Sequence, residues 1–176
     1  MYNLLNRLPY ILLCLLLFKS TSALAVQKEY VLKAGFLYNF ARFGQWQIPA
    51  DTTAPFAICS PDKQFIDIAN AALEGRKVHT RQLINKHIEL NTQTTSNCDI
   101  VFITDNTYTA WQSLKVHNVN NVMLVGETDG FIEQGGQIRF FLSSGKIRFE
   151  VAPSKLKEAG ITMSSKVLRL ARVVEG

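Results

Sequence analysis

Few residues of this sequence have the types and spacing that catalysis requires. A nucleophilic triad needs a serine or cysteine beside a base and an orienting acid, but the sequence contains no Gly-x-Ser-x-Gly elbow. Ser143-Ser144-Gly145 has the composition of a hairpin tip instead. Three histidines could act as bases or metal ligands but show no ligand spacing to a cysteine: His79, His87 and His117. We therefore predict no catalytic residue and no metal site.

The glycines of the second half do not form a loop for a phosphate or a cofactor. Gly126, Gly130 and the Gly135-Gly136 pair fit neither the Gly-x-Gly-x-x-Gly nor the P-loop pattern. Gly135-Gly136 precedes an apolar run and indicates a turn with a positive φ. The acidic side chains of the same stretch are interpreted as a solvated loop: Glu127, Asp129 and Glu133. We expect no cofactor and no enzymatic activity.

The first 25 residues have the pattern of a secretory signal peptide. Arg7 precedes an almost wholly apolar run from Leu8 to Phe18, and Ala23-Leu24-Ala25 is a small-residue cleavage site. The apolar run has about eleven residues, whereas a membrane span needs roughly 20, which disfavours the alternative of an uncleaved anchor. We expect residues 1–25 to be removed and residues 26–176 to form one exported domain.

Export changes how the cysteines are interpreted. Cys14 would leave with the signal peptide, so the mature chain would keep only Cys59 and Cys98. In an oxidising compartment two cysteines permit a single disulfide. Such a bond would close a loop of about 40 residues and stabilise the fold by about 4 kcal/mol in the chain-entropy model. The alternative is a reactive or metal-binding thiol pair, but no Cys-x-x-Cys occurs. We predict a structural Cys59–Cys98 disulfide.

Composition and charge are those of a globular protein without affinity for nucleic acid. The chain has 176 residues, of which 47% are hydrophobic and 19% are charged. These values fit one domain and exclude a disordered or fibrous protein. The formal charge of +5 falls once Arg7 and Lys19 leave with the signal peptide, because 17 basic side chains then face 14 acidic ones. This excess is too small and too scattered to predict nucleic-acid binding.

Alternating apolar runs and helical patterns predict the elements that must position any site. The first helix spans Glu29–Trp46, and its many aromatic residues are interpreted as buried rather than as a face for a partner or ligand. Strands are predicted at Phe56–Cys59, Lys77–Leu83, Ile88–Leu90, Asp99–Thr104 and Val122–Val125. Further helices are predicted at Phe65–Leu73 and Thr107–Val116.

The C-terminal part has a different pattern. Gln137–Leu142 and Lys146–Val151 flank the hairpin tip, and the tail adds a helix from Pro153 to Ala159 and a last helix capped by Ser164 or Ser165. The whole pattern predicts an α/β fold: a single three-layer domain whose mixed, partly parallel sheet is flanked by helices and ends in a C-terminal β-hairpin plus helix.

The first predicted helix resembles the opening motif of the YfiR family, in the run Lys33-Ala34-Gly35-Phe36-Leu37-Tyr38-Asn39-Phe40-Ala41-Arg42-Phe43 followed by Trp46. Later features resemble the family in the same order: Ile58-Cys59, Leu73 to Val78, Cys98 to Ile103, Gly136 to Phe141, Ile147 to Val151, and Ala159 to Ala171. The resemblance covers nearly the whole mature chain. Two departures are Gln47-Ile48, which stand where the family often has Pro directly after Trp, and the single cysteine pair.

This resemblance implies a periplasmic regulatory protein without enzymatic activity. Family members look like repressors that bind the periplasmic sensor region of an inner-membrane diguanylate cyclase and so lower cyclic di-GMP and biofilm formation. The resemblance also implies a homodimer, and an OmpA-like outer-membrane lipoprotein that can sequester the repressor. The alternative function is a periplasmic small-molecule-binding module of a transport or sensing system. An exported hydrolase is disfavoured because no nucleophile motif is present.

A repressor needs an exposed surface for its partner, and the predicted hairpin and tail are the best candidates for it. Strand alternation places Glu150 on the face opposite to that of its buried neighbours, and Arg139 lies on the adjacent strand. Ile161 follows Gly160 in a connecting stretch that is expected to be exposed. We therefore expect Arg139, Glu150 and Ile161 to belong to the partner-binding surface. The alternative is that these residues only solvate a sheet face and pack the tail.

Overall fold

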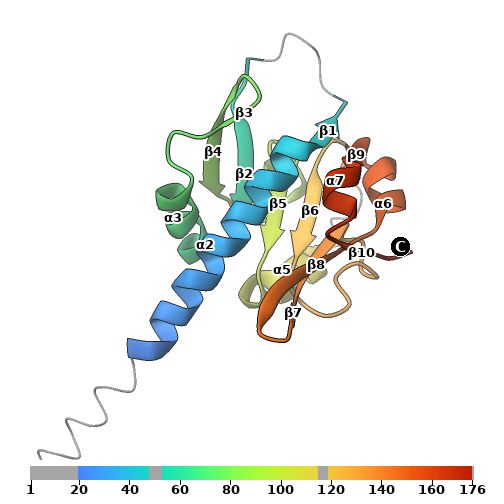
Figure 1. The fold of residues 1–176 in the computed structure, drawn as a ribbon. Helices are drawn as coiled ribbons and strands as arrows, with labels where there is room; N and C mark the ends of the chain where they lie inside the picture. Colours follow the sequence, from blue (N-terminus) through green and yellow to red (C-terminus); the bar gives the residue numbers. More distant parts are fainter. Residues whose placement is uncertain (1–19, 48–52, 115–118, 176) are drawn as a thin grey trace, which may run out of the picture.

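The longest element of the fold is helix α2 (Ser20–Phe43), which lies across one face of a β-sheet in the computed structural model (Figure 1). The structure describes residues 20–47, 53–114 and 119–175. Tyr30, Leu37 and Phe40 are buried on one side of α2, because residues three, four and seven apart share a helix face. Val31 and Leu32 remain exposed on the other side. Within the described part of the chain, no helix has both the length and the apolar composition of a membrane span.

Helix α2 ends three residues earlier than the sequence predicts. Gly44–Trp46 form the short strand β1, which pairs antiparallel with β9 (Ile161–Met163). A Cβ at Gly44 would lie 2.6 Å from the Trp46 ring and 2.8 Å from the carbonyl oxygen of Phe40. Glycine therefore lets the chain leave the helix with Trp46 folded back onto it. Of the expected signal peptide, residues 1–19 lie outside the described residues and residues 20–25 form the first turns of α2.

A mixed sheet of eight strands forms the centre of the molecule. Its strands are β2 (Phe56–Ser60), β3 (Lys77–Val78), β4 (Arg81–His87), β5 (Ile100–Ile103), β6 (Met123–Gly126), β7 (Ile138–Ser143), β8 (Lys146–Val151) and β10 (Arg172–Val173). Their order is β10-β8-β7-β6-β5-β2-β4-β3. The neighbours from β4 to β7 are parallel, the β7–β8 hairpin is antiparallel, and β10 runs parallel to β8. This confirms the predicted mixed, partly parallel sheet.

Helices cover both faces of the sheet, as a three-layer domain requires. The helices beside α2 are α3 (Lys63–Ala72), α4 (Thr92–Thr95), α5 (Asp105–Leu114), α6 (Pro153–Glu158) and α7 (Ser165–Leu168). Residues of α2, α3, α6 and α7 share the larger core with one set of strand side chains, which includes Ile58 and Ile100. Trp111 of α5 belongs to a smaller core with the alternate strand side chains, which include Cys59 and Val101. Strand alternation thus supplies both cores.

Cys59 and Cys98 form a disulfide, as predicted. Cys59 lies in β2, and Cys98 lies two residues before the neighbouring strand β5. Their Cα atoms are 6.0 Å apart, and both residues are buried in the smaller core. The bond therefore ties together two central strands on the side covered by α5.

Several predicted boundaries change in the structure. The segment predicted as one strand from Lys77 to Leu83 divides into β3 and β4 around His79, whose φ is 52°. Ile88–Leu90 forms no strand, although its chain continues directly from β4. Helix α5 begins at Asp105 rather than Thr107, and the expected end of that helix at Val116 lies outside the described residues. The positive φ expected at the glycine pair is found at Gly135, with φ 104°.

Candidate functional site

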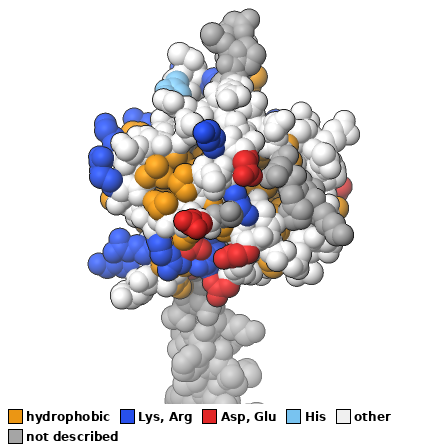
Figure 2. Space-filling model, turned by 90° about the vertical axis from the view of Figure 1, so that its right-hand side faces the viewer, with side chains coloured by type: hydrophobic (Ala, Val, Ile, Leu, Met, Phe, Trp, Pro, Cys, Tyr) orange, Lys and Arg blue, Asp and Glu red, His pale blue; other side chains and the backbone are white. Residues whose placement is uncertain are grey.

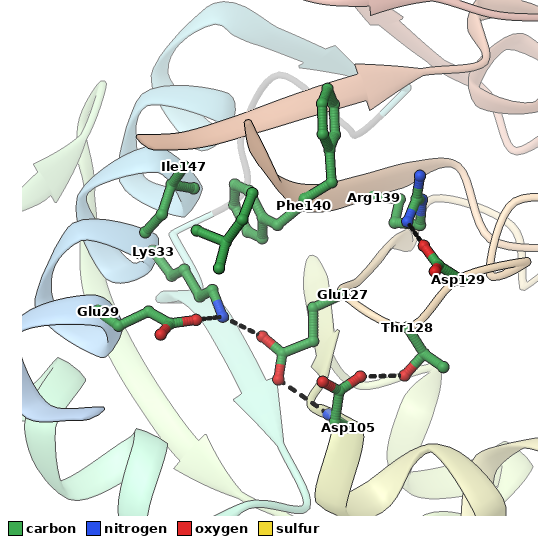
Figure 3. Close-up of a pocket in the computed structure, with 11 residues that line it drawn as sticks. Glu29, Lys33, Asp105, Glu127, Thr128, Asp129, Arg139, Phe140 and Ile147 are labelled. Atoms are coloured by element: carbon green, nitrogen blue, oxygen red, sulfur yellow. Dashed lines mark hydrogen bonds and ion pairs between the residues drawn. The ribbon is translucent and has the colours of Figure 1, made fainter. Parts of the chain in front are cut away.

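A cavity of about 500 Å³ opens where strands β5 and β6 end (Figure 3). Helix α2 contributes Glu29 and Lys33 to one wall, and the segments that follow β5 and β6 contribute Asp105 and Glu127. The β7–β8 hairpin supplies a further wall, which includes Ile147. The carboxyl ends of parallel strands are the usual ligand position in open α/β sheets, so this cavity is the candidate site.

Lys33 is the central charge of the cavity. Its side chain is only 5% exposed, and its Nζ donates hydrogen bonds to carboxylate oxygens of both Glu29 and Glu127. Glu127 also accepts a hydrogen bond of 2.9 Å from the backbone N–H of Asp105. Burial raises the pKa of Glu127 above its ordinary value, and the charge and hydrogen bond of Lys33 only partly oppose this shift. One ammonium group therefore forms ion pairs with two carboxylates.

A second charged cluster joins the cavity to the C-terminal strand. Glu150 accepts from Nε of Arg139 at 2.6 Å and from Nε of Arg172 at 2.8 Å, and Arg139 also pairs with Asp129. Burial opposes the ionisation of Glu150, but the hydrogen bonds and charges of the two arginines outweigh it and lower the pKa of that carboxyl. The Arg172 guanidinium lies 4.4 Å from the centroid of the Phe141 ring. Glu150 thus fastens β10 to the hairpin.

The crevice between the ends of β2 and β5 is filled by a buried polar network. The Tyr30 hydroxyl donates to Asp62 at 2.8 Å, and Thr104 Oγ1 donates to the same oxygen at 2.9 Å. Burial beside Asp62 raises the pKa of the Tyr30 phenol. Strand order reverses between β2 and β5, which is where doubly wound sheets usually open to a ligand. The network fills the position between β2 and β5. The cavity lies instead beside β6, the next strand after β5 in the sheet.

The outer face near the C-terminus carries exposed apolar and basic side chains. Figure 2 views the side on which α6, α7 and β10 lie in Figure 1, and it shows hydrophobic side chains gathered beside Lys and Arg side chains. Leu170 and Val173 are 72% and 57% exposed, and Arg148 and Arg172 are exposed as well. Phe141 is half-buried beneath Arg172. By register, Phe141, Arg148 and Arg172 lie on one face of the sheet, whereas Val173 lies on the other face of the edge strand β10. These three residues, Val173 and Leu170 are together called the C-terminal surface below.

Comparison with known proteins decides the family. The YfiR/HmsC-like family matches residues 30–172, which is most of the chain. The protein belongs to this family. A crystal structure of a conserved domain protein from Vibrio cholerae O1 biovar El Tor strain N16961 is similar at 12% sequence identity and a TM-score of 0.41, covering 72% of this chain and 56% of that one. This chain thus spans less than two thirds of that protein, and a likeness at this level bears on neither fold nor function. The comparison with curated proteins finds no similar sequence.

Membership of the YfiR/HmsC-like family gives the general function. The family consists of periplasmic, non-catalytic regulatory proteins of cyclic di-GMP signalling, and it is generally associated with a diguanylate cyclase. Among the described residues, no three His, Cys, Asp or Glu side chains are grouped so that they could hold a metal ion. His79 and His87 are exposed, and His117 lies outside the described residues.

The residues predicted to touch a partner do not share an exposed surface in this family member. Ile161 is fully buried, because its strand β9 pairs with β1 and its side chain lies in the larger core, so the expectation that it is exposed is wrong. Glu150 is also buried, with a side chain 7% exposed, because Arg139 and Arg172 cover it. The structure does bring Arg139 and Glu150 together, as register partners in the hairpin.

Apart from Arg139, sequence reasoning did not identify the residues of the cavity. The interpretation of Glu127 as part of a solvated loop is wrong, because its side chain is only 10% exposed and pairs with Lys33. Lys33 is a charged residue on the otherwise apolar side of α2, three positions after Tyr30 and four before Leu37. A lysine at such a position signals a buried ion pair. Glu127 directly follows an apolar strand, where a sheet presents its carboxyl edge. The sequence cannot show that these two residues, 94 positions apart, bind each other.

Proposed function

We propose that this protein binds the periplasmic sensor region of an inner-membrane diguanylate cyclase and represses the enzyme, which lowers cyclic di-GMP and biofilm formation. Membership of the YfiR/HmsC-like family supports a regulatory role in cyclic di-GMP signalling. A repressor shifts the cyclase only by binding its inactive conformation more tightly than its active one. The proposal therefore requires a surface suited to a protein partner.

The C-terminal surface is the observation that supports binding of a partner. It combines the exposed apolar side chains of Leu170 and Val173 with the guanidinium groups of Arg148 and Arg172. Apolar anchors beside arginines are typical of protein interfaces. The basic side chains favour an acidic complementary surface on the cyclase.

The predicted residues Arg139 and Glu150 lie beneath this surface and fix the position of Arg172 in it. Glu150 holds Arg172 against Phe141, and Arg139 holds Glu150. We assign both residues a positioning role in partner binding, whereas Ile161 supports the core on which the tail packs. The proposal also includes a homodimer and sequestration by an OmpA-like outer-membrane lipoprotein, and both of these rest on the family resemblance alone.

The test combines cyclic di-GMP measurements with direct binding. Leu170→Asp and Arg148→Glu should raise cyclic di-GMP in cells that contain the protein and its own cyclase, because each change replaces a side chain that would contact the partner. Both residues are exposed, so the melting temperature of the purified variants should stay unchanged. The same variants should retain less of the cyclase in a pull-down from solubilised membranes.

A control variant separates loss of this surface from a general effect of charge. Lys86 is exposed on β4, which lies at the far end of the sheet from β8. Lys86→Glu should therefore repress like the wild type. Normal repression by both Leu170→Asp and Arg148→Glu would show that the partner binds another surface. Failure of the unaltered protein to retain any diguanylate cyclase would contradict the proposed function itself.

A further inference from the structure

The cavity between α2, the end of β6 and the β7–β8 hairpin has the size of a small-molecule site. Its volume of about 500 Å³ lies within the range of known ligand pockets. Its position at the carboxyl ends of β5 and β6 is also the usual one for ligands in α/β proteins. Figure 3 shows Lys33 and Glu127 pointing toward each other from opposite elements, with Ile147 and Phe140 on the hairpin side.

The charges of the cavity walls favour a positively charged ligand. Each of the two cations is already shared by two carboxylates: Lys33 by Glu29 and Glu127, and Arg139 by Asp129 and Glu150. Asp105 adds a further carboxylate, which accepts a hydrogen bond from Thr128. An anion would therefore meet cations that are already neutralised. Burial raises the pKa of Glu127, and the negative charge of Asp105 acts in the same direction, against the opposing effect of Lys33.

The other half of the cavity is apolar. Phe140, Phe141, Leu142 and Ile147 of the hairpin are among its lining residues, and Leu142 and Ile147 are register partners that share one face of the hairpin. An inorganic cation would leave this wall in contact with water. No three acidic or other metal-ligating side chains of the described residues are grouped as a metal site. The combination fits an organic cation that has an apolar body.

We propose that the cavity binds a small amphipathic amine. The ammonium group would lie beside Glu127 and Asp129, and the apolar body would lie against Ile147 and its register partner Leu142. Binding would stabilise the folded protein, because a ligand bound only by the native state raises the free energy of unfolding. This inference concerns the purified protein alone and does not depend on the identity of any cyclase.

The first experiment uses three probes that differ in one property each. 3-Phenylpropylamine has both the cation and the apolar body, 3-phenylpropionate replaces the cation with an anion, and propylamine lacks the ring. Calorimetric titration and thermal unfolding of the purified domain should show saturable binding of 3-phenylpropylamine. Its affinity should exceed that of each of the other two probes by about tenfold or more.

Two variants then locate the binding site. Glu127→Gln keeps the shape and a hydrogen-bonding group of the side chain, and Asp129→Asn changes a side chain that is 98% exposed and needed by no core contact. Each variant should weaken the binding of 3-phenylpropylamine by at least about fivefold, since each removes one facing negative charge. Glu133→Gln, an exposed residue that does not line the cavity, is the control and should bind the amine like the wild type.

Three outcomes would overturn the inference. Equal or tighter binding of 3-phenylpropionate would show that the cavity prefers an anion. Unchanged amine affinity in both Glu127→Gln and Asp129→Asn would place the amine elsewhere. No binding of any probe at about 1 mM would show that the cavity holds no ligand of this class. Since none of these measurements involves the cyclase, repression in cells and amine binding can each fail without the other.

Discussion

Replacement of Glu150 by glutamine should destabilise the protein by about 2–3 kcal/mol. The carboxylate is almost fully buried and is the shared partner of Arg139 and Arg172. Removing one member of a fully buried ion pair costs about 3–5 kcal/mol, because the remaining charge is left without compensation. The expected value is lower here because Arg139 keeps its contact with Asp129, and because Arg172 is 55% exposed and can be hydrated.

The effect of Glu150→Gln should also depend on pH. The two arginines lower the pKa of Glu150 in the folded protein below its ordinary value of 4.5. A carboxyl group with a lowered folded-state pKa contributes stability that is present above the unfolded pKa and is lost as pH falls through the folded one. The difference between the wild type and Glu150→Gln should therefore be largest at neutral pH. It should shrink below about pH 4.5, where the unfolded-state carboxyl becomes protonated.

Urea unfolding followed by circular dichroism measures both quantities. Glu158→Gln is the matched control, because Glu158 is exposed on α6, and it should change the midpoint little at any pH. A loss below about 0.5 kcal/mol for Glu150→Gln, which is the range of ordinary surface substitutions, would refute the view that Glu150 fastens β10 to the hairpin. A loss of full size that does not change between neutral and acidic pH would refute the electrostatic explanation.

Two further predictions concern stability. The double variant Cys59→Ala/Cys98→Ala should lose about 4 kcal/mol, since the bond closes a loop with a sequence separation of 39; urea unfolding under non-reducing conditions measures this, and an unchanged midpoint would contradict it. Burial raises the pKa of Glu127 in the folded protein. The contribution of Glu127 to the free energy of unfolding is therefore full below its unfolded-state pKa and is lost as pH rises through its folded-state pKa. The wild type should therefore lose stability relative to Glu127→Gln over that interval in urea titrations at stepped pH, and a constant difference would contradict the shift.

The strands that build the centre of the sheet were predicted because their signals are local. Apolar runs bounded by proline, glycine or polar residues identify β2, β5 and β6, and the Ser-Ser-Gly tip identifies the β7–β8 hairpin. By contrast, β1, β9 and β10 contain only two or three residues each. Strands this short exist because of their partners: Gly44–Trp46 pairs with Ile161–Met163, more than a hundred positions away. No local sequence pattern predicts a pairing between segments so far apart in the chain.

The candidate site divides in the same way between sequence and tertiary structure. The sequence by itself predicted the disulfide, because only Cys59 and Cys98 are left to pair once Cys14 is assigned to the expected signal peptide. It also determined the resemblance to the family, because ordered motifs are a property of the chain alone. Only the tertiary structure decided that Glu150 is buried and that Lys33 meets Glu127, because burial and ion pairing depend on which distant segments cover a side chain. Strand alternation shows which face a residue takes, but the elements that lie over that face are fixed by the packing of the whole domain.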